Sequence, residues 1–248
     1  MHPTLAVTLQ SMQQDLARVQ SIAANLANAS TTGFKRAVVA ARPFADLLQA
    51  ANAAAAPGGA GGLALVTDAR AGTLRLTGHP FDVALAGEGL FEVRTAQGTA
   101  YTRQGDFHVD AGGRLVTARG DPVLGQGGEI TLLKTPVTID AAGRIFDASA
   151  TAGGAPERPL AQLRVVQPDD RAGLTSIGDG LLSAASAVTP MAESAYQVRQ
   201  GYLENSNVNP MQEMVQLMQA LRHFESMQKV AQGTDDMLST AIHKLGEL

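Results

Sequence analysis

Apolar residues recur at alternating steps of four and three near the N-terminus of this 248-residue chain. The series runs through Leu5, Leu9, Met12, Leu16, Val19, Ala23 and Leu26. This spacing places the side chains in one seam along an α-helix, as in the a and d positions of a heptad repeat. Pro3 suits a first helical turn, and Gly33 is a stop signal. The pattern predicts a helix over residues 3–28.

A second helical seam lies near the C-terminus. Steps of three and four connect Met214, Leu217, Leu221, Phe224, Gln228, Ala231, Asp235, Leu238, Ile242 and Leu245. Asn209 and Pro210 suit the N-cap and the first helical position, and no proline follows. The pattern predicts a long helix over residues 211–245, with a seam that Gln228 and Asp235 weaken in the middle.

Between the helices, short alternating runs broken by glycine predict β-strands. Examples are residues 73–77, 90–94 and 137–140. Two turns, at residues 110–113 and 140–143, place an aspartate before a glycine in the order expected of hairpin turns. The segment 50–62 is almost entirely Ala and Gly and predicts a loop.

These elements predict an α+β fold. We expect a discontinuous, coiled-coil-like helical domain formed by residues 1–36 and 196–248, an extended linker at 37–72, and a central antiparallel β domain at 73–195. The expected core positions of the β domain are Phe91, Tyr101, Phe107, Leu115, Val123 and Ile139.

Composition argues against several classes of function. The chain has no cysteine, so it holds no disulfide, thiolate metal site or cysteine nucleophile. Its net charge is −4 and it has no Lys/Arg run, so we expect no nucleic-acid partner. The five histidines lack metal-ligand spacing, and no serine sits in a nucleophile-elbow motif. We therefore predict no catalytic residue, metal or cofactor.

The chain lacks the ~20 continuous apolar residues that a membrane helix requires. It also lacks the basic and apolar N-terminal pattern of a secretory signal. We expect no membrane insertion, and export, if it occurs, by another route. The apolar side chains of both seams must be buried, and packing of the two helices on each other buries only part of them. The pattern therefore favours packing against neighbouring copies or related subunits.

Three sequence blocks resemble the flagellar rod and hook family of axial proteins. The first is residues 21–36, where Asn25, Leu26, Asn28, Thr32, Gly33 and Phe34 match the family's N-terminal signature. The second is residues 77–107, similar to the family's entry into its β domain, although the family usually has Phe where Leu90 stands. The third is residues 200–215, which resembles the approach to the C-terminal helix.

Within the family, the chain looks most similar to the proximal-rod subunit. The resemblance implies a structural subunit of the flagellar basal-body rod, which stacks its terminal helices into a tube and performs no catalysis. It also implies partners among proximal and distal rod subunits and copies of itself, and passage through the flagellar type III export apparatus without signal cleavage. The residues expected to carry assembly are the apolar members of the two seams.

Two alternatives remain at this point. One is a distal-rod or hook subunit of the same family. The other is a secreted, β-rich, adhesin-like binding module that trimerises through a coiled coil. For Asn25 and Asn28, subunit contact and simple termination of the first helix are both open.

Overall fold

The computed structural model describes residues 3–41, 63–132, 136–148, 158–169 and 173–246. The chain divides into two compact units. We call residues 1–27, 37–65 and 209–248 the helical unit, and residues 28–36 and 66–208 the β unit. The predicted loop at 50–62 lies outside the described residues.

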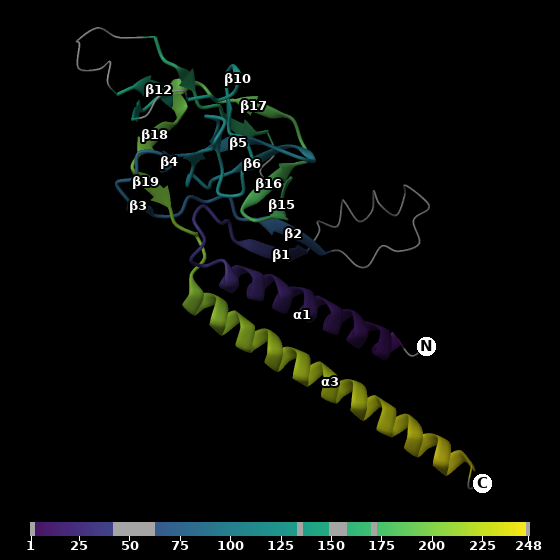
Figure 1. The fold of residues 1–248 in the computed structure, drawn as a ribbon. Helices are drawn as coiled ribbons and strands as arrows, with labels where there is room; N and C mark the ends of the chain where they lie inside the picture. Colours follow the sequence, from purple (N-terminus) through teal and green to yellow (C-terminus); the bar gives the residue numbers. More distant parts are fainter. Residues whose placement is uncertain (1–2, 42–62, 133–135, 149–157, 170–172, 247–248) are drawn as a thin grey trace. The chain divides into compact units, whose positions relative to one another are not determined.

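The helical unit contains two helices, α1 (Pro3–Ala27) and α3 (Pro210–Gly246). They lie side by side and antiparallel, because Asn25 contacts Glu213 while Asp15 contacts His223 (Figure 1). Both predicted helices are thus present within about a residue of their predicted ends. Two short strands, β1 (Ala37–Ala41) and β2 (Leu63–Thr67), pair with each other.

Local chemistry accounts for where α3 begins. The side-chain Oδ1 of Asn209 accepts hydrogen bonds from the backbone N–H groups of Met211 at 3.1 Å and Gln212 at 3.4 Å. Asn209 is therefore the N-cap of α3, and its own carbonyl accepts the first helical bond from Glu213. Pro210 follows at the first helical position, where an N–H would have no partner within the helix.

The β unit is built from short strands. Its first half contains β3 (Leu74–Leu76), β4 (Val83–Ala86), β5 (Leu90–Thr95), β6 (Gly98–Thr102), β7 (His108–Val109), β8 (Leu115–Val116), β9 (Leu124–Gly125) and β10 (Gly128–Glu129). Its second half contains β11 (Val137–Ile139), β12 (Arg144–Asp147), β13 (Ala161–Gln162), β14 (Val165–Pro168), β15 (Leu174–Gly178), β16 (Leu181–Ala184), β17 (Val188–Pro190), the 3-10 turn η2 (Glu193–Ala195), β18 (Gln197–Gln200) and β19 (Tyr202–Glu204).

Antiparallel pairing organises these strands. The largest sheet has the order β15-β16-β6-β5-β14-β17, and a three-stranded sheet has the order β11-β12-β13. Smaller pairs are β18-β4, β19-β3, β7-β8 and β10-β9. Each pairing with a defined register in this unit is antiparallel. The predicted α+β class with a central antiparallel β region is confirmed.

The two aspartate turns have the same geometry. In each, the aspartate Oδ1 accepts backbone N–H bonds from the residues two and four positions later, for Asp110 at 2.8 and 2.9 Å and for Asp140 at 3.0 and 2.9 Å. The other carboxylate oxygen pairs with the arginine four positions on, Arg114 or Arg144. These turns close the β7-β8 and β11-β12 hairpins, as the sequence predicts.

The core of the β unit has two parts on opposite faces of β5. Phe91 and Val93 enter the larger cluster, where the Phe91 ring meets the edge of Phe107 at 5.3 Å between centroids. Five of the six predicted core residues are buried in that cluster. Tyr101 is the exception, because strand alternation turns it to the other face of the sheet. There it is half-buried against a smaller cluster that includes Leu90.

The unit boundaries differ from the predicted ones. Residues 28–36, 66–72 and 196–208 join the β unit instead of the helical domain or a linker. For residues 196–208 the reason is strand pairing, since β18 pairs with β4 and β19 with β3. Residues 28–36 and 66–72 join the unit through bonds from Gly33, Lys35 and Gly72 to Glu204. No helix among the described residues is long and apolar enough to cross a membrane.

Candidate functional site

The predicted seam of α1 divides into two sets in the helical unit. Met12, Val19 and Leu26 are half-buried, whereas Leu9 and Leu16 are 51% and 52% exposed. Ala23, the third member of the outer set, is also exposed. The most buried positions are one residue earlier at each heptad, namely Thr8, Asp15 and Ile22. The inner face of α1 is therefore rotated by about one residue from the apolar seam.

The seam of α3 divides in the same way. Leu217, Phe224 and Ala231 are half-buried, whereas Met214 and Leu221 are 46% and 45% exposed. The buried positions on this helix are again one residue earlier, at Glu213 and Ala220. Further exposed apolar side chains along the helix are Met211, Val215, Met218, Val230 and Met237. Of the predicted assembly residues, Leu5, Leu238, Ile242 and Leu245 have side chains outside the described part.

The helical unit thus departs from the usual distribution of polarity. Several of the side chains it buries are polar, including Thr8, Asp15, Asn25 and Glu213. Asp15 Oδ2 lies 2.6 Å from His223 Nδ1, so at least one inward carboxylate has a partner on the other helix. Apolar side chains meanwhile project outward along both helices. An exposed apolar stripe of this kind is typical of a protein interaction surface.

A buried cluster of charges lies in the β unit, and each of the three sequence blocks contributes one residue to it. Glu204, at the end of β19, contacts Lys35 Nζ at 2.6 Å and Arg103 Nη1 at 3.0 Å. Its Oε1 also accepts the backbone N–H of Gly72 at 2.7 Å. All three charged side chains are 3% exposed or less. Burial lowers the pKa of Lys35, which the Glu204 carboxylate offsets only in part.

Backbone contacts surround this cluster. Gly33 has φ +65° and donates its N–H to the Glu204 carbonyl at 2.7 Å. A Cβ at Gly33 would lie 2.4 Å from the backbone nitrogen of Gln104, so a side chain does not fit there. The Asn207 side chain accepts the Arg36 N–H and donates to the carbonyls of Asp68 and Arg70. The sequence blocks therefore converge on one junction.

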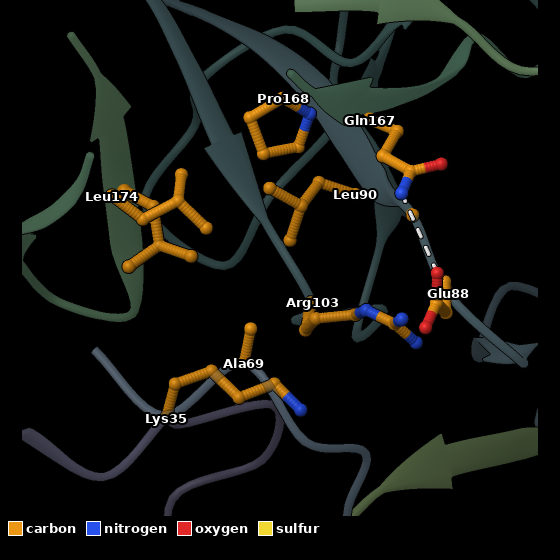
Figure 2. A pocket seen from close by; sticks show the side chains of 10 residues that line it. Lys35, Ala69, Glu88, Leu90, Arg103, Gln167, Pro168 and Leu174 are labelled. Carbon is orange, nitrogen blue, oxygen red and sulfur yellow. Dashed lines mark hydrogen bonds between the residues drawn. The ribbon is translucent and has the colours of Figure 1, made fainter. Parts of the chain in front are cut away.

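A small cavity borders the charge cluster. Figure 2 shows Leu90, Pro168 and Leu174 on one side and Lys35 and Arg103 on the other. The cavity holds about 30 Å³, enough for water but far below the size of ligand pockets, ~300–1,000 Å³. A larger open hollow of about 570 Å³ adjoins Arg103. Its charged walls have partners: Arg103 pairs with Glu204, Asp68 pairs with Arg70, and Glu88 accepts a hydrogen bond from Gln167.

The other polar groups singled out in the sequence form no evident reaction centre. Within the described part of the chain, no cluster of three His, Asp or Glu residues is arranged to hold a metal. Asp106 is half-buried, and burial raises its pKa, with the neighbouring Asp82 carboxylate acting in the same direction. Asp110 is part of a turn, and His108 is exposed on β7.

The residues of the N-terminal signature have structural partners. Asn25 is buried and bonded to Ala37 and Glu213, and Asn28 Oδ1 accepts from the Thr31 hydroxyl. Phe34 is buried, while Leu26 is half-buried. Lys35, Arg103 and Glu204 lie inside the three sequence blocks, but their pairing was not predicted. Each motif contains other polar or charged residues, such as Arg36, Gln104 and Asn205, so the sequence carried no signal that singled these three out.

Three family models match the chain. A flagellar basal body rod protein model matches residues 7–35, a flagellar hook protein FlgE/F/G D1 domain model matches 84–147, and a flagellar basal body rod FlgEFG protein C-terminal model matches 199–243. They fall on α1, the first part of the β unit, and the segment from β18 into α3. This order agrees with the three blocks found in the sequence.

Full-length relatives agree with the models. The chain is 32% identical to the flagellar basal-body rod protein FlgF of Caulobacter vibrioides, over 96% of each chain. It is 35% identical to the rod protein FlgG of Agrobacterium fabrum, over 95% of this chain and 96% of the relative. It is 32% identical to FlgF of Salmonella typhimurium, over 95% of each. These findings favour the rod prediction over the adhesin-like alternative.

The two antiparallel terminal helices, the antiparallel β unit, the matched models and the end-to-end relatives agree. The chain belongs to the flagellar basal-body rod family and is a structural, non-enzymatic rod subunit of the FlgF/FlgG type.

Proposed function

We propose that this subunit is held in the rod through the outward apolar residues of its two terminal helices. We define the outer stripe as Leu9 and Leu16 on α1 together with Met214, Met218 and Leu221 on α3. The observation that carries the proposal is the row of exposed apolar side chains on both helices, beside an inner face that includes polar groups. Apolar side chains about half exposed on both helices would gain most from burial against helices of neighbouring subunits.

The size of the effect follows from the exposed area. Complete burial of a leucine side chain stabilises by about 1.5–3 kcal/mol, so a half-exposed leucine has about 1 kcal/mol left to gain. Leu9 and Leu16 together would contribute roughly 2 kcal/mol per subunit contact. A loss of that size corresponds to about a thirtyfold weaker contact.

A paired substitution tests the outer stripe. In Leu9→Gln/Leu16→Gln, the content of this subunit in purified hook-basal bodies should fall while the isolated chain keeps its helix content by circular dichroism. Leu76→Gln is the matched control, because Leu76 is 66% exposed on β3 in the β unit. Normal incorporation of the helix variant, or an equal loss with the control, would argue against assembly through the outer stripe.

We further infer that the chain occupies the FlgF position, which the family resemblance associates with the proximal rod. The support is length: alignments to FlgF proteins run over 248 to 252 positions, whereas those to FlgG proteins run over 253 to 261. The test is complementation in the source organism. The chain should restore motility to a strain lacking its FlgF and not to one lacking FlgG, and the reverse pattern would reassign it.

The partners that follow from this position are proximal and distal rod subunits, other copies of this chain and the flagellar type III export apparatus. The proposed location is the rod where it crosses the periplasm, with the N-terminus left uncleaved. Mass spectrometry of the assembled subunit should find a peptide that begins within the first residues of the sequence. A mature N-terminus inside α1 would contradict export without cleavage.

A further inference from the structure

Polar side chains of α1 and α3 meet at two levels along the helix pair, buried at the first and partly exposed at the second, where His223 is exposed. Asn25 meets Glu213 near the end of α1, and Asp15 meets His223 ten residues along each helix. Heptad spacing alone specifies register poorly, because a slip of seven residues repeats the same face. A buried polar pair can specify register, because a slip removes each group from its partner.

Asn25 has the more complete set of partners. Its Nδ2 donates to Glu213 Oε2 at 3.1 Å and to the Ala37 carbonyl at 2.8 Å, and its Oδ1 accepts the Ala37 N–H at 2.9 Å. Ser21 Oγ donates to the same Ala37 carbonyl at 2.9 Å. Asn25 and Glu213 are each 1% exposed. Asn25 thereby joins α1, β1 and the first turn of α3.

We propose that Asn25 and Glu213, the register pair, set the alignment of α1 with α3 and so determine which residues face outward. A slip would separate the buried Glu213 carboxylate from the Asn25 amide, which disfavours every shifted alignment. With the pair in place, Leu9 and Leu16 on α1 project outward together with Met214 and Leu221 on α3. Register selection itself is independent of the proposed function, and only its consequence for rod assembly rests on it.

The two polar contacts calibrate a direct measurement of register. From the first contact to the second, the residue number falls by ten on α1, from 25 to 15, and rises by ten on α3, from 213 to 223. Four residues further along, Ser11 and Met227 therefore lie at about the same level. Ala220, Met227 and Thr234 follow one another at intervals of seven along the inner, buried or half-buried face of α3. Each interval corresponds to about 10.5 Å along the helix. A disulfide requires Cα atoms within about 7 Å, so each pairing reports one register.

The chain contains no cysteine, so introduced pairs have no competitors. Ser11→Cys is combined in turn with Ala220→Cys, Met227→Cys or Thr234→Cys, and the purified chain is oxidised at high dilution. The rate of intramolecular disulfide formation is followed by mass spectrometry. The three pairs are then compared in the Asn25→Leu/Glu213→Leu background, which keeps the helices but removes the register pair.

With the register pair present, position 227 should react at least about tenfold faster than 220 or 234, because each slip breaks a charge-assisted hydrogen bond. In the double-leucine background the three rates should converge to within a few-fold. Equal rates with the pair intact, or unchanged preference for 227 without it, would overturn the proposal. The second result would assign register to another contact, such as Asp15 with His223.

A second pair of variants, which moves the acid from position 213 to position 25, tests the proposal if the double-leucine chain does not fold. Asn25→Asp places a carboxylate against Glu213 and should broaden the pattern. Asn25→Asp/Glu213→Gln restores an acid and amide pair between the helices and should recover part of the preference for position 227, since the bond to the Ala37 carbonyl stays lost in both variants. Failure of the second variant to recover it would contradict the register pair. The readout needs no rod, so it remains valid whether or not the outer stripe mediates assembly.

Discussion

The buried cluster in the β unit contains two cations and one carboxylate, which leads to an asymmetric prediction. Glu204→Gln keeps the side-chain shape but leaves Lys35 and Arg103 buried at 3% exposure without their shared counter-ion. Removing one partner from a buried ion pair typically costs about 3–5 kcal/mol. Lys35→Met instead leaves a one-to-one pair of Arg103 and Glu204. The Arg70 carbonyl then loses the lysine donor but keeps Asn207.

We therefore expect Lys35→Met to cost about 1 kcal/mol, well below the loss from Glu204→Gln. The assay is urea unfolding followed by tyrosine fluorescence. The chain has no tryptophan, and its three tyrosines, Tyr101, Tyr196 and Tyr202, all lie in the β unit, so the signal reports on that unit alone. The variant Lys35→Met/Glu204→Gln should be more stable than Glu204→Gln, since one unpaired cation has been removed.

The pH dependence supplies a second readout. Because burial lowers the pKa of Lys35, the unfolded chain binds more protons than the folded chain between the folded pKa and the ordinary lysine value. Stability conferred by this site should therefore rise with pH through that alkaline window, and Lys35→Met should lack the rise. Equal costs for Lys35→Met and Glu204→Gln, with no difference in their alkaline pH profiles, would refute the charge-imbalance argument.

Three further changes have defined outcomes. Gly33→Ala should destabilise the β unit by more than Gly78→Ala in urea unfolding, because both glycines have positive φ but only Gly33 faces backbone within 3 Å; equal losses would show that contact to be unimportant. Because burial raises the pKa of Asp106, the free energy of unfolding should fall as pH rises from the ordinary aspartate pKa to the raised one. Asp106→Asn should remove this fall, and an unchanged acid-range profile would contradict it. Asn209→Ala should weaken α3 by about 1 kcal/mol in thermal unfolding monitored at 222 nm, whereas Asn209→Ser, which restores a cap, should not.

Much of the fold could be predicted because local patterns determined it. The heptad steps located both helices, and Asn209 with Pro210 located the start of α3. Aspartate at the start of a turn and glycine at its end located two hairpins. Each of these signals acts within a few residues along the chain. The helices and hairpins that these signals predict therefore form in the same places whatever long-range contacts the fold makes.

The contacts that could not be predicted from the sequence are long-range. Lys35 and Glu204 are 169 positions apart, and nothing in either motif identifies the other as its partner. The seams were located, but which of their members face inward was not, because the inner face is centred on Thr8 and Asp15 instead of on leucine. Hydrophobic periodicity assumes that apolar residues point inside, whereas here about half of the described seam residues, such as Leu9 and Met214, face outward.

The most direct test of assembly through the outer stripe is site-specific photo-cross-linking in intact hook-basal bodies. A photoreactive amino acid is placed at Leu16, at Met218 or at Ala220, and the partners are identified by mass spectrometry. We predict that positions 16 and 218, about half exposed in the subunit, cross-link to axial rod subunits, while the buried position 220 cross-links within the chain. Cross-links from positions 16 and 218 that stay within the chain, or that reach only non-axial proteins, would contradict the account.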